Sequence, residues 1–416
     1  MCPSPARTSL YDGAISCYHK QYEHGKGIIM HVVVVGGGYG GVKAALELSK
    51  RHVGRITLIS SHDYFLHHDS LYATATGKST EESVIPLNAL FMHHPRVEII
   101  NDTITGLDSH RKLISSKKKD YHYDILILAL DSTTSFLNVK GIKSHAYGIK
   151  TLDEVREFQS HIQDEVIQKK LDKEFFVIGG GLTGVEMASA LQEYLQLLVS
   201  LYRLKNARPK VTLVESSSRL VPRLSRTASH AITKRLKSMG VNVLLNQTVS
   251  ALDDNKITVE GRIFPTTTAI WTSGTIPNSF FKANADSFNR AADGRVYVTP
   301  YLEALDDVYV IGDASTVKHS DYSLSVYAQA THTAKNISRR ATGRHQKPFH
   351  PRRGPISVPA GAHWGYVEWH GMYLTGRSGL VVRRWLDLLT YHRIMPLKMA
   401  IPIWRSHDVR DVDDIF

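Results

Sequence analysis

The stretch HVVVVGGGYGG, residues 31–41, decides the class of fold of this 416-residue chain. Its first half is a β-branched run, which is typical of a strand buried on both faces of a sheet. The glycines follow at once, and an apolar helical pattern then runs from Val42 to Arg51. A short apolar strand at Ile56–Ile59 completes the strand, turn, helix and strand of a dinucleotide-binding unit. The sequence therefore predicts a Rossmann-like α/β unit.

Each glycine of this turn has a separate task in binding a dinucleotide. Gly36 permits the tight turn, Gly38 lets the backbone approach a diphosphate, and Gly41 allows close contact between helix and strand. The helix N-terminus adds free amides and partial positive charge. A strand before the glycines and a helix after them are the context that this motif requires.

The same arrangement appears a second time. Phe175–Ile178 precedes a glycine turn at 179–184, a helical pattern runs to about Leu204, and Val211–Val214 follows. Two nucleotides are therefore expected. Glu215 ends the second copy, where a carboxylate accepts hydrogen bonds from ribose hydroxyls and repels a 2′-phosphate, so NADH is favoured over NADPH. The matching residue of the first copy, Ser60, makes weaker bonds to ribose.

Composition excludes several classes of protein. Lys and Arg number 51 against 39 Asp and Glu, a surplus of +12 that favours an anionic membrane surface. No nucleic-acid motif occurs, and no histidine pattern predicts a metal site. Both cysteines, Cys2 and Cys17, precede the first strand, which argues against CxxC chemistry. No apolar run is long enough to span a bilayer, so a cytoplasmic or membrane-face location is expected.

The region from Gly379 to Arg405 has the pattern of a helix lying in a membrane interface. Its apolar residues alternate with arginines, giving an apolar face edged with arginine and tryptophan. Pro396 and Pro402 are expected to break this helix.

These segments, together with residues 123–130, 269–278 and 309–313, resemble the two-dinucleotide flavoproteins of the pyridine nucleotide-disulfide oxidoreductase type. More narrowly, residues 131–152 and the tail from Val358 resemble type II NADH:quinone oxidoreductases. The likeness covers about residues 30–405. The family's first glycine motif and Gly-Asp segment hold FAD, which implies cofactor contacts at Gly36, Gly38, Gly41, Ser60, Ala129, Asp131, Gly312, Asp313 and Ala328. Its second motif holds NADH, which implies contacts at Gly179, Gly181, Gly184, Glu215 and Gly274.

The resemblance also assigns catalytic positions. Glu186 would lie near the contact between flavin and nicotinamide, and Gln329 would act at the quinone site together with Thr333. Two departures stand out. Relatives have Ala and Gln where this chain has Thr331 and Thr333, and usually Gly where it has Asp131, a carboxylate that would disfavour the anionic reduced flavin.

The expected fold class is α/β, with two Rossmann-like three-layer dinucleotide-binding domains, the second inserted in the first, and a C-terminal amphipathic membrane-associating region. The expected divisions are a disordered extension at 1–29, an FAD-binding domain at 30–145 and 278–342, an NADH-binding domain at 146–277, and a membrane-association region at 343–416.

The implied activity is hydride transfer from NADH to FAD, followed by transfer of two electrons to a membrane quinone without proton pumping. The chain would act as a peripheral protein on the cytoplasmic face of the cell membrane. A soluble NADH-dependent reductase of another acceptor, whose tail forms a homodimer contact, remains open. So does a nucleotide-binding redox sensor with little turnover, which the departures at Ser60, Asp131 and Thr333 would fit.

Overall fold

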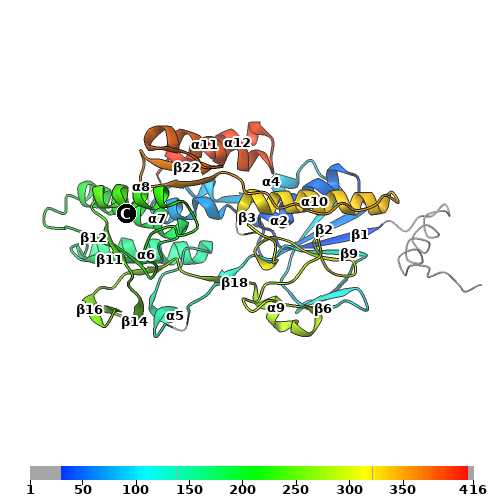
Figure 1. Ribbon diagram of the computed structural model, residues 1–416, viewed down its shortest axis with the longest axis horizontal. Helices are drawn as coiled ribbons and strands as arrows, with labels where there is room; N and C mark the ends of the chain where they lie inside the picture. The colour runs from blue at the N-terminus through cyan, green and yellow to red at the C-terminus, as the bar shows by residue number, and fades with distance from the viewer. Residues whose placement is uncertain (1–29, 138, 321, 411–416) are drawn as a thin grey trace, which may run out of the picture. The chain divides into compact units, whose positions relative to one another are not determined.

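The computed structural model describes residues 30–137, 139–320 and 322–410, and these form two compact units (Figure 1). The first unit contains residues 30–63, 91–131 and 279–351, and the second contains 64–90, 132–278 and 352–410. The extension expected at 1–29, with both cysteines, lies outside the described residues. The domain divisions expected from the sequence stay a prediction.

The first unit is built on a six-stranded sheet with the order β19-β20-β9-β1-β2-β5. All neighbouring strands are parallel except β19, which pairs antiparallel with β20. The strand predicted at His31–Val35 is confirmed as β1, and Ile56–Ile59 lies within β2. The bounds are β1 His31–Val35, β2 Arg55–Ser60, β5 Val97–Asn101, β9 Ile125–Leu128, β19 Glu303–Leu305 and β20 Val308–Val310.

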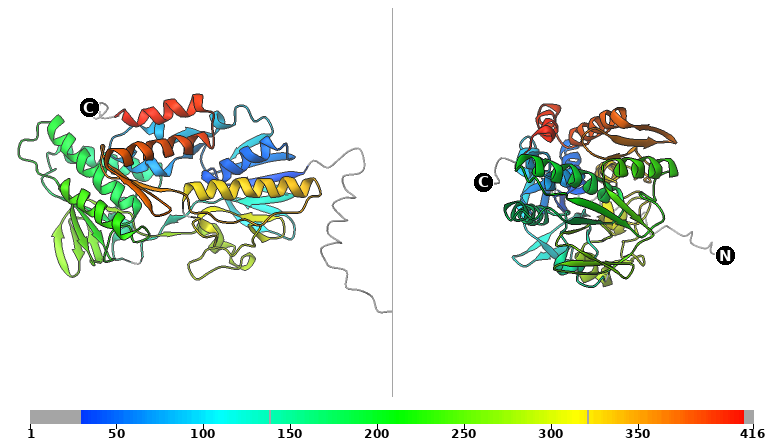
Figure 2. Two further views of the ribbon diagram at one scale, coloured as in Figure 1. Left: turned by 45° about the horizontal axis from the view of Figure 1, so that its top comes forward. Right: turned by 90° about the vertical axis from the view of Figure 1, so that its left-hand side faces the viewer.

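The two faces of this sheet are covered differently. On one face, α2 (Tyr39–Lys50) packs along α10 (Ser323–Ala341), and Figure 2 shows the two helices side by side. On the other face, Val33 and Val35 pack in one core with residues of an antiparallel sheet and of a short helix. These elements are β6 Ile104–Asp108, β7 Leu113–Ser116, β8 Asp120–His122 and α9 Ser279–Ala283.

The second unit repeats this plan around a parallel sheet with the order β13-β12-β11-β17. Its strands are β11 Glu174–Ile178, β12 Lys210–Glu215, β13 Asn242–Leu245 and β17 Ala269–Trp271. Phe176 and Ile178 pack in one core with Leu252 and Ile257 of a small antiparallel sheet. That sheet is formed by β14 Val249–Asp253, β15 Lys256–Val259 and β16 Arg262–Pro265. The helix after the glycine turn, α7 (Leu182–Leu201), ends three residues before the expected Leu204.

Further helices and short strands complete this unit around the two sheets. Near the start of the chain these are β3 Tyr64–Leu66, α3 Leu71–Ala75, β4 Val84–Pro86 and α4 Leu87–Phe91, whose last residue lies in the first unit. The others are β10 Thr133–Thr134, α5 Ile142–His145, α6 Leu152–Ile167, α8 Arg226–Ser238 and β18 Thr275–Ile276.

The C-terminal region contains a sheet that the sequence analysis did not predict. Three antiparallel strands precede the helices, namely β21 Ile356–Pro359, β22 Gly365–Trp369 and β23 Met372–Thr375. Two helices follow, α11 (Gly376–His392) and α12 (Leu397–Arg405). Pro396 separates them, as expected, but the break predicted at Pro402 is wrong because α12 continues through it. A proline removes only one backbone donor, and α12 is also held by packing on α11.

The arginines of α11 lie on a different side from the one expected. Arg383 and Arg384 are turned inward, with side chains only 11% and 15% exposed. Val381, Trp385 and Leu389 are instead 55%, 58% and 51% exposed, one helical turn apart along α11. The expected apolar face is therefore present, but the adjacent arginines do not edge it, since they are held in ion pairs inside the unit. None of the helices in the described part of the chain is both long and apolar enough to cross a bilayer.

Candidate nucleotide sites and a buried charge network

The first glycine turn joins β1 to α2 and leaves no room for side chains. Gly36 has φ +114°, and a Cβ there would overlap the carbonyl oxygen of Ala129. A Cβ on Gly41 would overlap the carbonyl oxygen of Gly36. Gly38 caps α2 without any side-chain hydrogen bond to the helix amides. This arrangement leaves the amides of the first turn of α2 available to an anion.

A carboxylate lies beside this turn. The Oδ1 atom of Asp131 is 2.6 Å from the position that a Cβ on Gly38 would take. A negative charge near the N-terminus of a helix interacts favourably with the helix dipole. Asp131 therefore sits where it would repel a second anion, such as a diphosphate, at the same helix end.

The Gly-Asp segment after β20 is held by the glutamine of α10. The Oε1 atom of Gln329 accepts a hydrogen bond from the backbone N–H of Gly312 at 3.0 Å, and Gly312 has φ +79°. Gln329 is fully buried, and its Nε2 atom has no hydrogen-bond acceptor among the described residues. Asp313 follows in the same turn and is half-buried. A buried donor without an acceptor is costly, so this amide suits a polar ligand atom.

The remaining positions expected in the first unit are distributed around α10 and β2. Thr333 is fully buried one turn after Gln329, with no partner for its hydroxyl among the described residues, whereas Ala328 is exposed. Ser60 is buried, and its hydroxyl accepts a hydrogen bond from the N–H of His62. Gln329 and Thr333 thus share a buried face of α10, and their assignment to a quinone stays a prediction.

The second glycine turn has the same geometry in the second unit. Gly179 has φ +114°, and a Cβ on Gly184 would overlap its carbonyl oxygen. Gly181 caps α7, and a Cβ there would meet nothing within 4 Å. The N-terminus of α7 therefore opens onto free space at the point where a diphosphate would approach.

The carboxylate of Glu215 lies against this turn. Its Oε2 atom accepts a hydrogen bond from the N–H of Gly180 at 2.5 Å, and its Oε1 atom accepts one from Ser217 at 2.7 Å. The carbonyl oxygen of Gly274, which has φ +78°, accepts a hydrogen bond from the N–H of Ser135. Glu215 is thus fixed beside the turn by two backbone N–H groups.

Glu186 belongs to a buried charge network that sequence reasoning missed. The guanidinium of Arg383 is 4.0 Å from Oε1 of Glu186 and 3.0 Å from Oδ1 of Asp387. Burial raises the pKa of Glu186 to about 8, and Arg383 opposes this shift while Asp69 adds to it. Burial likewise raises the pKa of Asp387 to about 6. At neutral pH the Glu186 carboxyl therefore holds a proton.

The network continues from α11 to the segment before β4. Arg384 donates to the carboxylate of Glu82 at 3.0 Å, and the Nδ1 atom of His407 lies 2.7 Å from the same carboxylate. Hydrogen bonding to His407 and the charge of Arg384 lower the pKa of Glu82 in spite of its burial. The sequence signal for these contacts was the adjacent arginine pair, which we interpreted only as the edge of an apolar face.

Replacing Glu186 by glutamine is expected to stabilise the protein in a pH-dependent way. A carboxyl whose pKa is raised on folding binds its proton more tightly in the folded state, so wild-type stability falls as pH rises from about 5 to 8. Glutamine is neutral in both states and does not incur this loss. The difference in melting temperature between Glu186→Gln and wild type should therefore grow in favour of the variant from about pH 5 to pH 8. Above pH 8 this difference should stay constant. A difference in melting temperature that does not change with pH would contradict a protonated Glu186 at neutral pH.

The family model of the pyridine nucleotide-disulphide oxidoreductases matches residues 30–336. Among curated proteins, the type II NADH:quinone oxidoreductase of Staphylococcus saprophyticus is 25% identical over 89% of this chain and 97% of its own length. The protein of the same name from Staphylococcus haemolyticus is 26% identical with the same coverage.

Solved structures share the fold. NDH2 from Plasmodium falciparum in complex with NADH superposes with a TM-score of 0.79, at 15% identity, over 91% of this chain and 97% of that one. The sulfide:quinone oxidoreductase of Aquifex aeolicus superposes with a TM-score of 0.75, at 18% identity, over 89% and 92%. The match of the family model over most of the chain, together with two glycine turns at strand-helix junctions, shows that this chain belongs to the pyridine nucleotide-disulphide oxidoreductase family.

Proposed function

We propose that this chain is an FAD-dependent NADH:quinone oxidoreductase that works as a peripheral protein on the cytoplasmic face of a membrane. The observation that carries the proposal is the pair of glycine turns, each opening the N-terminus of a long helix to an anion. The names of the staphylococcal relatives support the choice of NADH and quinone as substrates, since those proteins match nearly the whole chain.

The residues of the first unit fit a flavin dinucleotide. The turn at Gly36, Gly38 and Gly41 would hold the diphosphate, and the Gly312–Asp313 segment, held by Gln329, would hold the ribityl chain. FAD supplies the ability to accept a hydride and release electrons to a second acceptor, while the protein aligns the reactants. The protein itself would position these backbone groups and exclude water from them.

Asp131 is expected to weaken this cofactor site. Asp131→Asn removes a negative charge beside Gly38, so the affinity of the stripped protein for FAD should rise about tenfold, which corresponds to about 1.4 kcal/mol. Titration of the stripped protein with FAD, followed by fluorescence quenching, measures this. Asp120→Asn, at an exposed position of β8 in the same unit, is the matched control and should change nothing. Weaker FAD binding by Asp131→Asn would contradict a repulsion between the Asp131 carboxylate and the diphosphate of FAD.

Glu215 is expected to select NADH. Its carboxylate lies against the second glycine turn, where it would face the ribose of a bound nucleotide and repel a 2′-phosphate. Glu215→Gln keeps an acceptor but removes the charge, so kcat/KM for NADPH should rise about tenfold while that for NADH falls. Steady-state rates with both nucleotides measure this. An unchanged ratio would show that Glu215 does not face the ribose.

Glu186 would hold a proton for the acceptor. Reduction of a quinone to a quinol consumes two protons, and a buried carboxyl with a pKa of about 8 carries one at neutral pH. Arg383 lies 4.0 Å from that carboxyl and stabilises the carboxylate left after proton release. Gln329 and Thr333 remain the positions proposed to contact the quinone. The exposed apolar row of α11, formed by Val381, Trp385 and Leu389, would contact lipid.

One experiment separates the proposal from its alternatives. The purified chain is analysed for bound FAD, and its oxidation of NADH and NADPH is compared with a short-chain quinone as acceptor. Bound flavin that NADH bleaches and quinone reoxidises is the expected result. Flavin that NADH leaves unbleached would favour a redox sensor. Bleached flavin that quinone cannot reoxidise, in a protein that fails to float with anionic liposomes, would favour a soluble reductase of another acceptor.

A further inference from the structure

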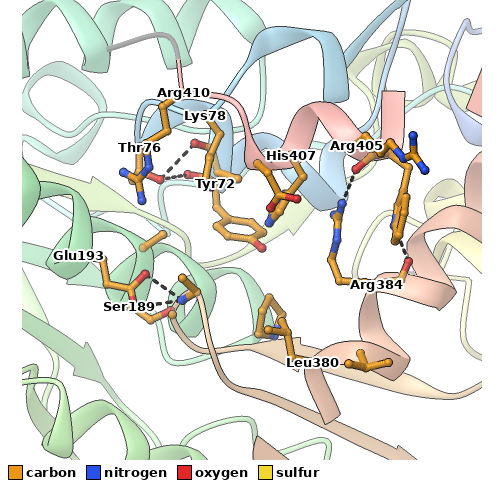
Figure 3. A pocket seen from close by; sticks show the side chains of 18 of the residues that line it. Tyr72, Thr76, Lys78, Ser189, Glu193, Leu380, Arg384, Arg405, His407 and Arg410 are labelled. Atoms are coloured by element: carbon orange, nitrogen blue, oxygen red, sulfur yellow. Dashed lines mark hydrogen bonds between the residues drawn. The ribbon is translucent and has the colours of Figure 1, made fainter. Parts of the chain in front are cut away.

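A cavity of about 370 Å³ lies within the second unit between α3, α7, α11 and α12 (Figure 3). Its volume falls within the range of about 300–1,000 Å³ that is usual for small-molecule sites. Figure 3 shows Lys78 and Arg410 together on one side of it and Arg384 and Arg405 on the other. The glycine turns do not line it, so the proposed electron transfer assigns it no role.

Two of these cations make no hydrogen bond or ion pair within residues 30–137, 139–320 and 322–410. The chain segments of Lys78 and Arg410 pair through an antiparallel backbone bridge, which brings the two residues side by side. Neither side chain makes a hydrogen bond or an ion pair with any residue in the described ranges, in contrast to Arg384, which is bound to Glu82. Burial and the neighbouring Arg410 lower the pKa of Lys78, and the charges of Asp408 and Glu82 oppose this shift only in part. Two adjacent cations that partly lose their hydration are stabilised by an anion bound between them.

The rest of the wall is mixed. Glu193, which accepts a hydrogen bond from the N–H of Ala362, and Asp408 also line the cavity, whereas the side formed by α11 and Trp404 is mostly apolar and continues to the surface. Leu380, Val381 and Trp385 of α11 and Trp404 of α12 line the cavity. Val381 and Trp385 are also more than half exposed and belong to the apolar row on α11. A ligand with an anionic head at Lys78 and an apolar chain along α11 would therefore leave the cavity on the face proposed to contact lipid.

We propose that this cavity binds the phosphate headgroup of an anionic phospholipid, with the phosphate between Lys78 and Arg410 and the first part of an acyl chain against α11. The proposal deepens the proposed membrane association and is independent of the redox chemistry. A free phosphate ion shares the head chemistry, but it would leave the apolar wall at Val381 and Trp385 uncovered. The apolar continuation therefore favours the lipid.

Calorimetric titration of the full-length holoprotein tests this with three probes: dihexanoyl phosphatidylglycerol below its critical micelle concentration, dihexanoyl phosphatidylcholine, and inorganic phosphate. We expect saturable binding of the phosphatidylglycerol with one site per chain, and binding at least tenfold weaker for the other two. The double variant Lys78→Gln/Arg410→Gln should lower the affinity for phosphatidylglycerol at least tenfold, whereas Lys78→Arg should retain it. The matched control is Arg377→Gln/Lys398→Gln, which removes the same charge from exposed positions of α11 and α12.

Equal binding of inorganic phosphate and phosphatidylglycerol, or an equal loss in the control variant, would overturn the proposal. Lipid binding that appears only after removal of residues 411–416 would also overturn the proposal. In that case the three aspartates of this segment would be the anions that pair with Lys78 and Arg410. NADH-dependent reduction of a soluble short-chain quinone is measured alongside. Loss of lipid binding with unchanged turnover isolates a failure of this site from a failure of the proposed oxidoreductase.

Discussion

Replacing Gly181 by alanine is expected to lower kcat/KM for NADH oxidation more than tenfold while leaving the bound flavin and the melting temperature unchanged. A Cβ on Gly181 would meet no atom of the described protein within 4 Å, and its φ of −70° suits alanine. The methyl group would instead fill the space through which a diphosphate approaches the amides of α7. The Kd for NADH should rise more than tenfold, measured by quenching of protein fluorescence.

The reciprocal variant, Gly38→Ala, provides the control. It should lose FAD and retain NADH binding, because its turn lies in the first unit. The Asp131 carboxylate that the new Cβ would meet is a side chain able to move, so the fold should tolerate the change. If Gly181→Ala oxidises NADH at the wild-type rate, the second turn does not hold the nicotinamide dinucleotide. If both variants lose both ligands, the two turns do not act separately.

Replacing Arg383 by methionine is expected to produce the largest loss of stability. Arg383 lies between the carboxyls of Glu186 and Asp387, and its Nη1 atom donates to the hydroxyl of Ser357. Removing one partner of a buried ion pair costs about 3–5 kcal/mol, because the remaining charge stays buried without compensation. Thermal unfolding should show a melting temperature lower by several degrees.

The pH dependence identifies the cause of this loss. Without Arg383, Glu186 and Asp387 can avoid burying a charge by binding protons, so the destabilisation should be smaller at pH 5 than at pH 8. Arg377→Met, at an exposed position of the same helix, controls for the change of residue type and should shift stability by less than about 0.5 kcal/mol. A loss equal at both pH values would indicate that packing of the long side chain matters more than its charge.

The C-terminal helices show which structural features a sequence pattern predicts and which it does not. Alternation of apolar and basic residues predicted a helix from Gly379, and the structure begins α11 at Gly376. The same pattern placed Arg383 and Arg384 at the edge of an exposed face, and there it was wrong. Their partners, Glu82 and Glu186, lie far away in the chain, and a helical wheel contains no information about such contacts. Pro402 illustrates the same point, since packing on α11 maintained a helix that local preference would have ended.

What the sequence determined by itself is local and repeated: β-branched runs that form buried strands, and glycines at 36–41 and 179–184 whose backbone conformations and close contacts exclude any side chain. These features depend on a few adjacent residues, so their pattern is visible without the fold. Tertiary structure alone brought Glu186 to Arg383, Glu82 to His407, and Lys78 to Arg410. The physical reason is that the pKa of a carboxyl, or the lack of a partner for a cation, is set by neighbours that the chain brings together only on folding.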